Sequence, residues 1–133
     1  MRIDYHLSNM KKTQHQQAIH DLLKSTCGPM SADEIRDSLR NSKIGIATIY
    51  RALNKGVEEG EFKEIEFPNS ASRYERCGLS HHHHFICDDC DKAYDLSGCV
   101  DALRSLLPKH FTLKRHEIFL YGQCGQCKAV KKE

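Results

Sequence analysis

Two pairs of cysteines constrain the fold of this chain more than any other feature of its sequence. Cys87 and Cys90 form one CxxC unit, and Cys124 and Cys127 form a second unit near the C-terminus. Two intervening residues let a tight turn aim both sulfurs at one point, and two such turns complete a tetrahedral shell of four thiolates around Zn²⁺. A closed shell leaves no open coordination position, so the pattern predicts a structural zinc rather than a catalytic one.

Redox chemistry is the competing interpretation of these cysteines. A redox-active CxxC needs a thioredoxin-like βαβ context, which the surrounding pattern lacks. The chain has seven cysteines, an odd number that resists complete pairing in disulfides. Its first ten residues contain no signal-peptide core, and no apolar run approaches the roughly 20 residues of a membrane span. We therefore expect a cytoplasmic protein that binds metal through its thiols and has no membrane partner.

The composition of the chain changes near residue 77. Six of the seven cysteines and six of the nine histidines lie from Cys77 onward. A chain of 133 residues can form two small lobes, each of which needs a metal or a partner chain to be stable. We predict an N-terminal domain over residues 1–76, a hinge over 77–80 and a metal-binding domain over 81–133.

The first lobe has the pattern of three helices followed by a hairpin. Thr13 can cap a helix that runs to about residue 24, and Ser31 with Glu34 fits a capping box for a second helix. A third helix over about 46–59 has one apolar stripe, formed by Ile46, Ile49, Leu53 and Val57. Strand-like runs then follow at 62–67 and 73–75.

Helix, short turn, helix and hairpin is the plan of a winged helix-turn-helix, whose second helix can enter the major groove of DNA. Residues 1–55 carry nine Lys and Arg against five Asp and Glu, an excess suited to phosphates. Exposed hydroxyl and basic groups on and near the third helix can reach bases and phosphates. The predicted contacts are Lys43, Thr48, Tyr50, Arg51 and Lys55. A small helical domain with a solvated face is the alternative.

The second lobe is predicted to be rich in strands. The candidates are residues 85–86, 94–96 and 118–121, which flank the cysteine pairs. Between them, Ser97 can cap a helix that ends near Pro108 and carries Val100, Leu103, Leu106 and Leu107. The fold class expected for the whole chain is therefore α+β.

Four consecutive histidines, His81–His84, precede the first of these strands. Because side chains of an extended chain alternate, one pair of histidines faces each side, and one run can serve two metal sites. Candidate partners of His82 and His84 are Glu75, Cys77 and Asp95, and those of His81 and His83 are Asp101 and His116. A solvated His-rich loop is the alternative. Cys27 and Cys99 are interpreted as unpaired thiols or small buried hydrophobic residues.

Three motifs in order resemble the ferric uptake regulator family. They are the helix over residues 45–54, the His–Cys segment over 81–90, and the run over 116–124. The resemblance spans about residues 12–127. It implies a winged-helix DNA-binding domain, a hinge and an α/β dimerisation domain with a structural zinc. It also implies metal-dependent repression by a homodimer that binds a palindromic operator in double-stranded DNA, and no enzymatic activity.

The resemblance also assigns metal sites. The structural zinc falls on the four CxxC cysteines, and groove contacts fall on Tyr50 and Arg51. The regulatory site falls on Glu75, His82, His84 and Asp95. The additional site falls on His81, His83, Asp101 and His116. Iron- and peroxide-sensing members usually place a histidine where this chain has Pro29, whereas zinc uptake regulators use a cysteine in the hinge, as at Cys77. Thiolate with imidazole suits zinc. We therefore favour Zn²⁺ as the regulatory metal, with Fe²⁺ or Mn²⁺ as alternatives.

Two rival functions remain at this stage. A peroxide sensor with iron at the same site is one, and Asp95 is the residue type found there in such sensors. A small zinc metalloenzyme is the other, and it would need an open zinc with a nearby general base. No hydrolase motif such as HExxH is present, and the helix-turn-helix pattern would have no role.

Overall fold

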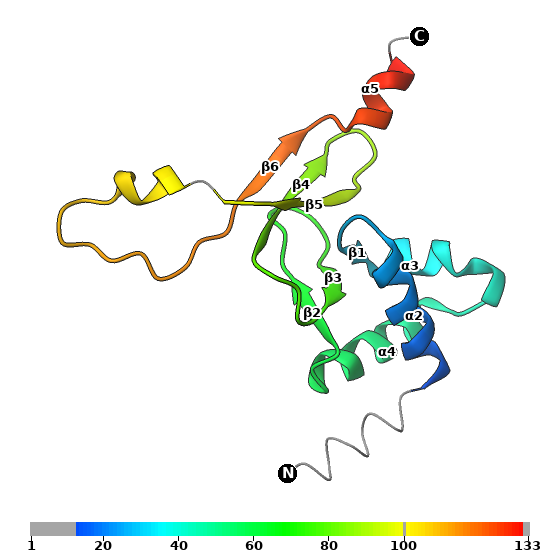
Figure 1. Cartoon of the computed structure of the whole chain (residues 1–133). Helices are drawn as coiled ribbons and strands as arrows, with labels where there is room; N and C mark the ends of the chain where they lie inside the picture. Colours follow the sequence, from blue (N-terminus) through cyan, green and yellow to red (C-terminus); the bar gives the residue numbers. More distant parts are fainter. Residues whose placement is uncertain (1–12, 100, 132–133) are drawn as a thin grey trace. The chain divides into compact units, whose positions relative to one another are not determined.

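The computed structural model describes residues 13–99 and 101–131, with the backbone alone at positions 101, 130 and 131. The chain forms two compact units, Met1–Gly78 and Leu79–Glu133 (Figure 1). The boundary between them falls inside the segment 77–80, and that this segment acts as a hinge stays a prediction. Within the described ranges, no helix is both long and apolar enough to cross a lipid bilayer.

Three helices form most of the first unit, and their bounds follow from their caps. Helix α2 spans Gln14–Ser25, and the hydroxyl of its N-cap Thr13 accepts a hydrogen bond from the backbone N–H of Gln16. Helix α3 spans Ala32–Ser38 and begins with the predicted capping box. The short 3₁₀ helix η1, Arg40–Ser42, leads to α4, Ile46–Glu58. The sequence predictions of these helices and of both side-chain caps are confirmed.

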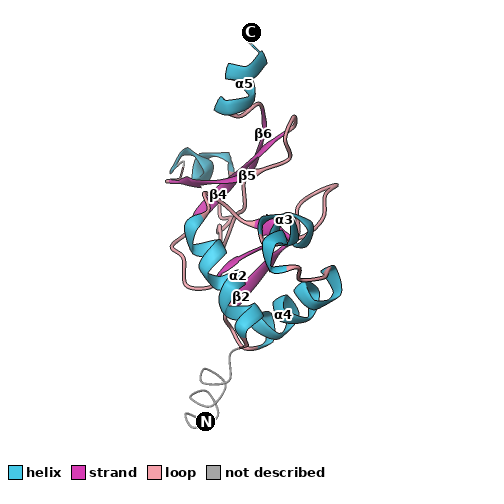
Figure 2. Cartoon of the chain, turned by 90° about the vertical axis from the view of Figure 1, so that its right-hand side faces the viewer, coloured by secondary structure: helices cyan, strands magenta, loops and turns pink. Residues whose placement is uncertain are grey.

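A three-stranded antiparallel sheet completes the first unit (Figure 2). Strands β2, Phe62–Ile65, and β3, Arg73–Arg76, form the predicted hairpin. Strand β1, Met30–Ser31, pairs with the other edge of β3 and was not predicted, because two residues carry no recognisable alternation. Three helices with this small sheet make a winged helix-turn-helix.

The core of the first unit lies where α4 packs on the other helices and on β2. Its buried residues are Ile19, Leu23, Ala32, Ile35, Ile49, Ala52, Leu53, Phe62 and Tyr74. The predicted apolar stripe of α4 is wrong at Val57, which is 36% exposed, whereas Gly56 is buried. The ring of Phe62 lies directly on Gly56, where an added Cβ would come within 2.2 Å of Phe62 Cδ2. The absence of a side chain at Gly56 therefore lets α4 dock on the sheet.

The second unit is built on a mixed sheet with the order β5-β4-β6. Strand β4, His82–Cys87, pairs antiparallel with β5, Ala93–Ser97, and parallel with β6, Phe119–Gly122. Helix α5, Gly125–Lys131, follows β6 and was not predicted. The three predicted strands are confirmed, although each extends beyond or shifts from its predicted bounds by one to three residues.

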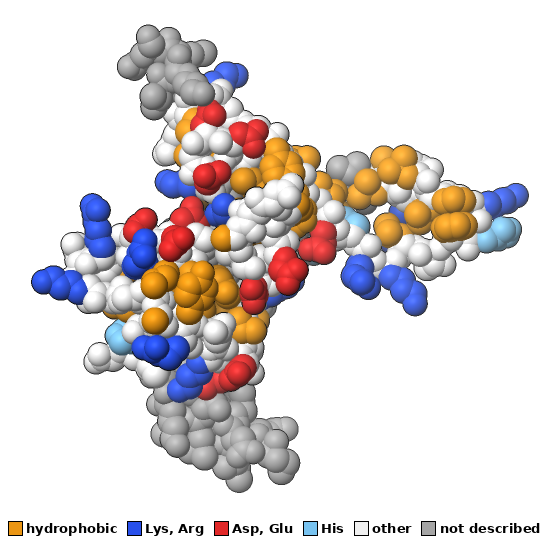
Figure 3. Space-filling model, turned by 180° about the vertical axis from the view of Figure 1, so that it is seen from behind, with side chains coloured by type: hydrophobic (Ala, Val, Ile, Leu, Met, Phe, Trp, Pro, Cys, Tyr) orange, Lys and Arg blue, Asp and Glu red, His pale blue; other side chains and the backbone are white. Residues whose placement is uncertain are grey.

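An arm over residues 101–117 leaves the sheet between β5 and β6 and extends away from it (Figure 1). The α-helix predicted after Ser97 is wrong, because the described residues between β5 and β6 form the 3₁₀ helix η2, Asp101–Leu106, and no α-helix. Val100 lies outside the described residues. Leu106 is 76% exposed and Phe111 is 65% exposed. Figure 3 shows hydrophobic side chains gathered on the arm, so part of the apolar pattern that predicted a buried helix is exposed to solvent.

Candidate metal centres and nucleic-acid interface

The four CxxC cysteines converge at one end of the second sheet. Cys87 ends β4, and the parallel register sets it opposite Gly122 on β6, two residues before Cys124. The four Sγ atoms lie within 4.8 Å of one another. Cys90 Sγ and Cys124 Sγ are 3.9 Å apart, close to the edge of about 3.8 Å that a tetrahedron with Zn–S bonds of about 2.3 Å requires.

The surroundings of these thiols fit a divalent cation. Burial and the neighbouring sulfurs raise the pKa of Cys127 to about 12. The hydroxyl of Tyr94 and the backbone N–H of Cys127 lower the pKa of Cys124 to about 6. The backbone N–H of Cys124 also donates to Cys87 Sγ at 3.3 Å. Two buried, one half-buried and one exposed thiol this close together cannot all ionise alone, but a bound Zn²⁺ would deprotonate them together, and the N–H groups would stabilise the thiolates.

A second cluster contains His82, His84 and Asp95. The antiparallel register sets His84 opposite Asp95, and a carboxylate oxygen of Asp95 lies 3.5 Å from His82 Nε2 and 3.4 Å from His84 Nε2. Nδ1 of His82 lies 2.7 Å from the carbonyl oxygen of Ser80 and must donate to it. In a neutral ring this leaves the Nε2 lone pair facing the carboxylate, an arrangement that a cation between them would stabilise.

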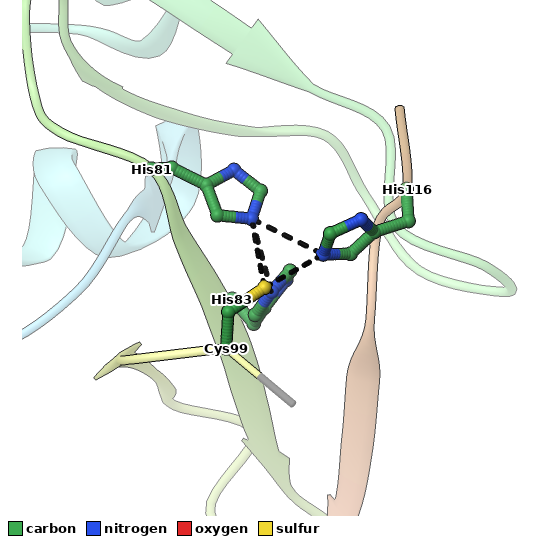
Figure 4. A group of neighbouring side chains, drawn as sticks. All are labelled: His81, His83, Cys99 and His116. Carbon is green, nitrogen blue, oxygen red and sulfur yellow. Dashed lines mark hydrogen bonds between the residues drawn. The ribbon is translucent and has the colours of Figure 1, made fainter. Parts of the chain in front are cut away.

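A third cluster lies on the opposite side of β4 and contains His81, His83, Cys99 and His116 (Figure 4). Nε2 of His81 is 3.1 Å from Nε2 of His83 and 3.3 Å from Nε2 of His116. Cys99 is exposed and its Sγ lies close to three imidazoles, so its interpretation as a small buried residue is wrong, whereas its interpretation as an unpaired thiol is confirmed. The side chain of Asp101, the predicted fourth ligand, lies outside the described residues.

The two remaining predicted metal ligands belong to the first unit. Glu75 lies on β3 and is 6% exposed. Cys77 follows β3, has an exposed side chain, and donates its backbone N–H to the carbonyl oxygen of Glu61 at 3.0 Å. Both residues therefore lie within a few positions of the boundary between the two units.

The predicted DNA-binding residues lie on or just before α4. Tyr50 is 44% exposed, Arg51 and Lys43 are exposed, and Thr48 and Lys55 are half-buried. The guanidinium of Arg51 donates to the hydroxyl of Thr48 at 2.9 Å, which holds both groups on the outer face of the helix. Lys43 has a positive φ of 57° at the end of η1, in the turn that precedes α4.

Comparison with known proteins decides the family. The sequence profile of the ferric uptake regulator family matches residues 7–131. The chain belongs to the ferric uptake regulator family. The ferric uptake regulation protein of Yersinia pestis is 30% identical over 129 residues, which cover 91% of this chain and 87% of that protein. Its counterpart in Campylobacter jejuni is 34% identical over 101 residues, which cover 74% of this chain and 64% of that protein.

The fold comparison agrees with this family. A crystal structure of the Vibrio cholerae ferric uptake regulator superimposes with a TM-score of 0.65 and 28% identity, covering 88% of this chain and 94% of that chain. As a ferric uptake regulator family protein, the chain is a metal-dependent transcriptional regulator. Sequence reasoning missed Cys99, whose partners are distant in sequence.

Proposed function

We propose that this family member is a zinc-sensing, homodimeric repressor that acts in the cytoplasm and binds a palindromic operator in double-stranded DNA. The observation that carries the proposal is the cluster of His82, His84 and Asp95, which begins four residues after the boundary at Gly78. The ligands of a cation held there lie close in sequence to the connection between the DNA-binding unit and the metal-binding unit. Metal binding at this cluster can therefore restrict the movement of the first unit.

The regulatory site in this proposal uses residues from both units. His82, His84 and Asp95 supply two imidazoles and a carboxylate, and Glu75 and Cys77 supply a carboxylate and a thiolate from the end of the first unit. Metal binding would tie the two units together and restrict the segment 77–80. To shift a conformational equilibrium from 1:99 to 99:1, the metal must prefer the closed state by about 5.5 kcal/mol. Multidentate Zn²⁺ binding releases more free energy than this in small metal-binding domains.

The choice of zinc rests on the donor atoms. Cys77 is an exposed thiol at the connection, and thiolates with imidazoles favour Zn²⁺ over Mn²⁺. Pro29, at the position where a histidine would supply a nitrogen ligand, has no donor atom and is fully buried. Asp95 favours the second candidate, an Fe²⁺ or peroxide sensor, because its carboxylate contacts both histidines and is a hard ligand.

The four-cysteine site has a separate, structural role in this proposal. Cys87, Cys90, Cys124 and Cys127 would hold a resident Zn²⁺ that joins the ends of β4 and β6 to α5. A closed four-thiolate shell offers no position for a substrate, so this zinc would supply stability and no catalysis.

Dimerisation is supported by the apolar surface of the second unit. Leu106 and Phe111 on the arm, and Leu120 and Tyr121 on β6, are all exposed. Strand β6 is an edge of its sheet, and an edge strand with exposed apolar side chains is suited to bury them against a second copy. Two copies would present two α4 helices to successive major grooves, as a palindromic operator requires.

The experiment that tests the proposal measures operator binding in gel shifts while Zn²⁺, Fe²⁺ or Mn²⁺ is added to chelator-treated protein. Replacing Cys77 with serine should raise the Zn²⁺ concentration needed for binding by about tenfold or more, because it removes the only thiolate of the regulatory site. Cys27→Ser is the matched control, since Cys27 is also an exposed cysteine of the first unit. Unchanged metal dependence in Cys77→Ser would exclude Cys77 as a sensing ligand.

The second candidate has its own observable. An iron-based peroxide sensor oxidises the imidazoles that hold its metal, so mass spectrometry after peroxide treatment of the Fe²⁺-loaded protein should detect oxo-histidine at His82 or His84. Oxo-histidine with Fe²⁺-dependent operator binding would replace zinc sensing with peroxide sensing.

A further inference from the structure

We propose that Cys99 is the fourth ligand of a Cys–His₃ site with His81, His83 and His116, and that this site takes Zn²⁺ in preference to Mn²⁺. The four residues all belong to the second unit, and the site shares no residue with the four-cysteine cluster or with the cluster of His82, His84 and Asp95.

The distances among the four donor atoms fit one tetrahedral ion. With Zn–N of about 2.05 Å and Zn–S of about 2.3 Å, the N···N edges of the tetrahedron measure about 3.3 Å and the N···S edges about 3.6 Å. The observed N···N distances from His81 are 3.1 and 3.3 Å. Sγ of Cys99 lies 3.5, 3.3 and 2.9 Å from Nε2 of His81, His83 and His116. Four of these five edges agree with the ideal values to within about 0.3 Å, and the distance from Cys99 to His116 is shorter.

Hydrogen bonding alone does not account for this arrangement. An imidazole nitrogen has either one proton or one lone pair in the plane of the ring, yet Nε2 of His81 faces three polar atoms at once. Figure 4 shows the three rings pointing their Nε2 atoms toward the same small region as the sulfur. A cation at that centre would satisfy all four lone pairs together.

The site is both built into the unit and accessible. His83 is only 5% exposed, and its polar edge points into the cluster. A cavity of about 390 Å³ lies beside the cluster and is lined by His81, Cys99, Leu103, Arg104, Leu113, Lys114, Arg115 and His116. A metal can enter and leave the site through this cavity.

The thiolate decides which metal the site prefers. Three imidazoles and a carboxylate accept Fe²⁺, Mn²⁺ or Zn²⁺, whereas a thiolate in the fourth position favours Zn²⁺ and disfavours Mn²⁺. Because Asp101 lies two positions after Cys99, the two residues are rival fourth ligands with opposite consequences for metal choice.

The position of the ligands also gives the site a local effect. Cys99 lies just before the arm and His116 lies at its far end. His83 lies on β4, and His81 directly precedes that strand. A bound ion would therefore join both ends of the arm to the sheet and reduce the motion of a segment that carries exposed apolar side chains.

The test uses the full chain with Co²⁺ as a spectroscopic probe and no DNA, so its outcome is independent of the proposed repressor function. The four-cysteine site is first filled with Zn²⁺, and Cys77→Ser serves as the background so that Cys77 contributes no signal. Added Co²⁺ should give a thiolate-to-metal charge-transfer band, and this band should disappear when Cys99→Ser is introduced. It should persist in Asp101→Asn and in the matched cysteine control Cys27→Ser.

A second variant keeps the test decisive if Cys99→Ser folds poorly. Cys99→Asp retains a ligand, so it should bind Co²⁺ without the charge-transfer band, and its preference for Zn²⁺ over Mn²⁺ in competition should fall by about tenfold or more. A band that persists in Cys99→Ser or Cys99→Asp would overturn the proposal. Loss of Co²⁺ binding in Asp101→Asn with normal binding in Cys99→Ser would assign the ligand to Asp101 instead.

Discussion

The contact between Gly56 and Phe62 allows a quantitative prediction about the DNA-binding unit. An alanine Cβ at position 56 would lie 2.2 Å from Cδ2 and 2.5 Å from Cε2 of a ring that is 1% exposed. Carbon atoms prefer a separation of 3.5–4.0 Å, so the ring or the helix must move by more than 1 Å. Such overpacking costs about 3 kcal/mol at the upper end of its usual range, and replacing glycine with alanine in a helix recovers about 1 kcal/mol. We expect a net loss of about 2 kcal/mol.

For a unit of this size, that loss lowers the melting temperature by about 10 °C. Far-ultraviolet circular dichroism during denaturant and thermal unfolding would follow it, because the two longest helices of the described chain, α2 and α4, lie in this unit. The decisive control is the same substitution in a Phe62→Leu background. Without the ring, Gly56→Ala should be neutral or should stabilise the helix by up to about 1 kcal/mol. Equal effects of Gly56→Ala in both backgrounds would refute the argument that the ring at Phe62 requires glycine.

Two further predictions concern the other stabilising contacts. Replacing Cys124 with serine should remove one Zn²⁺ per chain and unfold the second unit, because metal binding supplies the folding free energy of such a small sheet. The first unit should keep its melting transition. Metal analysis measures the loss of Zn²⁺, and hydrogen exchange of β4 measures the unfolding. Glu34→Ala should destabilise the first unit by about 3 kcal/mol in urea unfolding, since it removes the 2.8 Å ion pair to the buried Arg73 and half of the α3 capping box. A loss below about 1 kcal/mol would show that Arg73 is satisfied by its other contacts.

Local patterns were enough to predict most of the first unit. Thr13 and the Ser31–Glu34 pair mark helix starts through hydrogen bonds within three residues, so the sequence shows them directly. The stripe of α4 was correct at Ile49 and Leu53 and wrong at Val57, because periodicity does not reveal that the sheet approaches the helix through Gly56. Burial at this end of α4 depends on a tertiary contact that the helix pattern does not contain.

The second unit was harder to predict because its contacts are distant in sequence. The alternation of His81–His84 predicted which histidines share a side of β4, and the observed ring pairs follow that order. Cys99 was missed because the antiparallel pairing of β5 with β4 brings it to the histidines of β4, and the parallel pairing of β4 with β6 brings His116 to the same place. The helix predicted after Ser97 was wrong because apolar spacing indicates that a surface will be buried but not whether a helix or a second chain will bury it.

The alternation of side chains along β4 also limits how this protein can diverge. Residues 81–87 serve three clusters in turn, so inserting or deleting one residue there would turn the side chains on one side of the change to the opposite face of the strand. We therefore expect changes of length in this short run to disrupt the metal clusters. New metal preferences in descendants of this chain are expected to arise by exchange of single ligand types at fixed positions, not by remodelling of the strand.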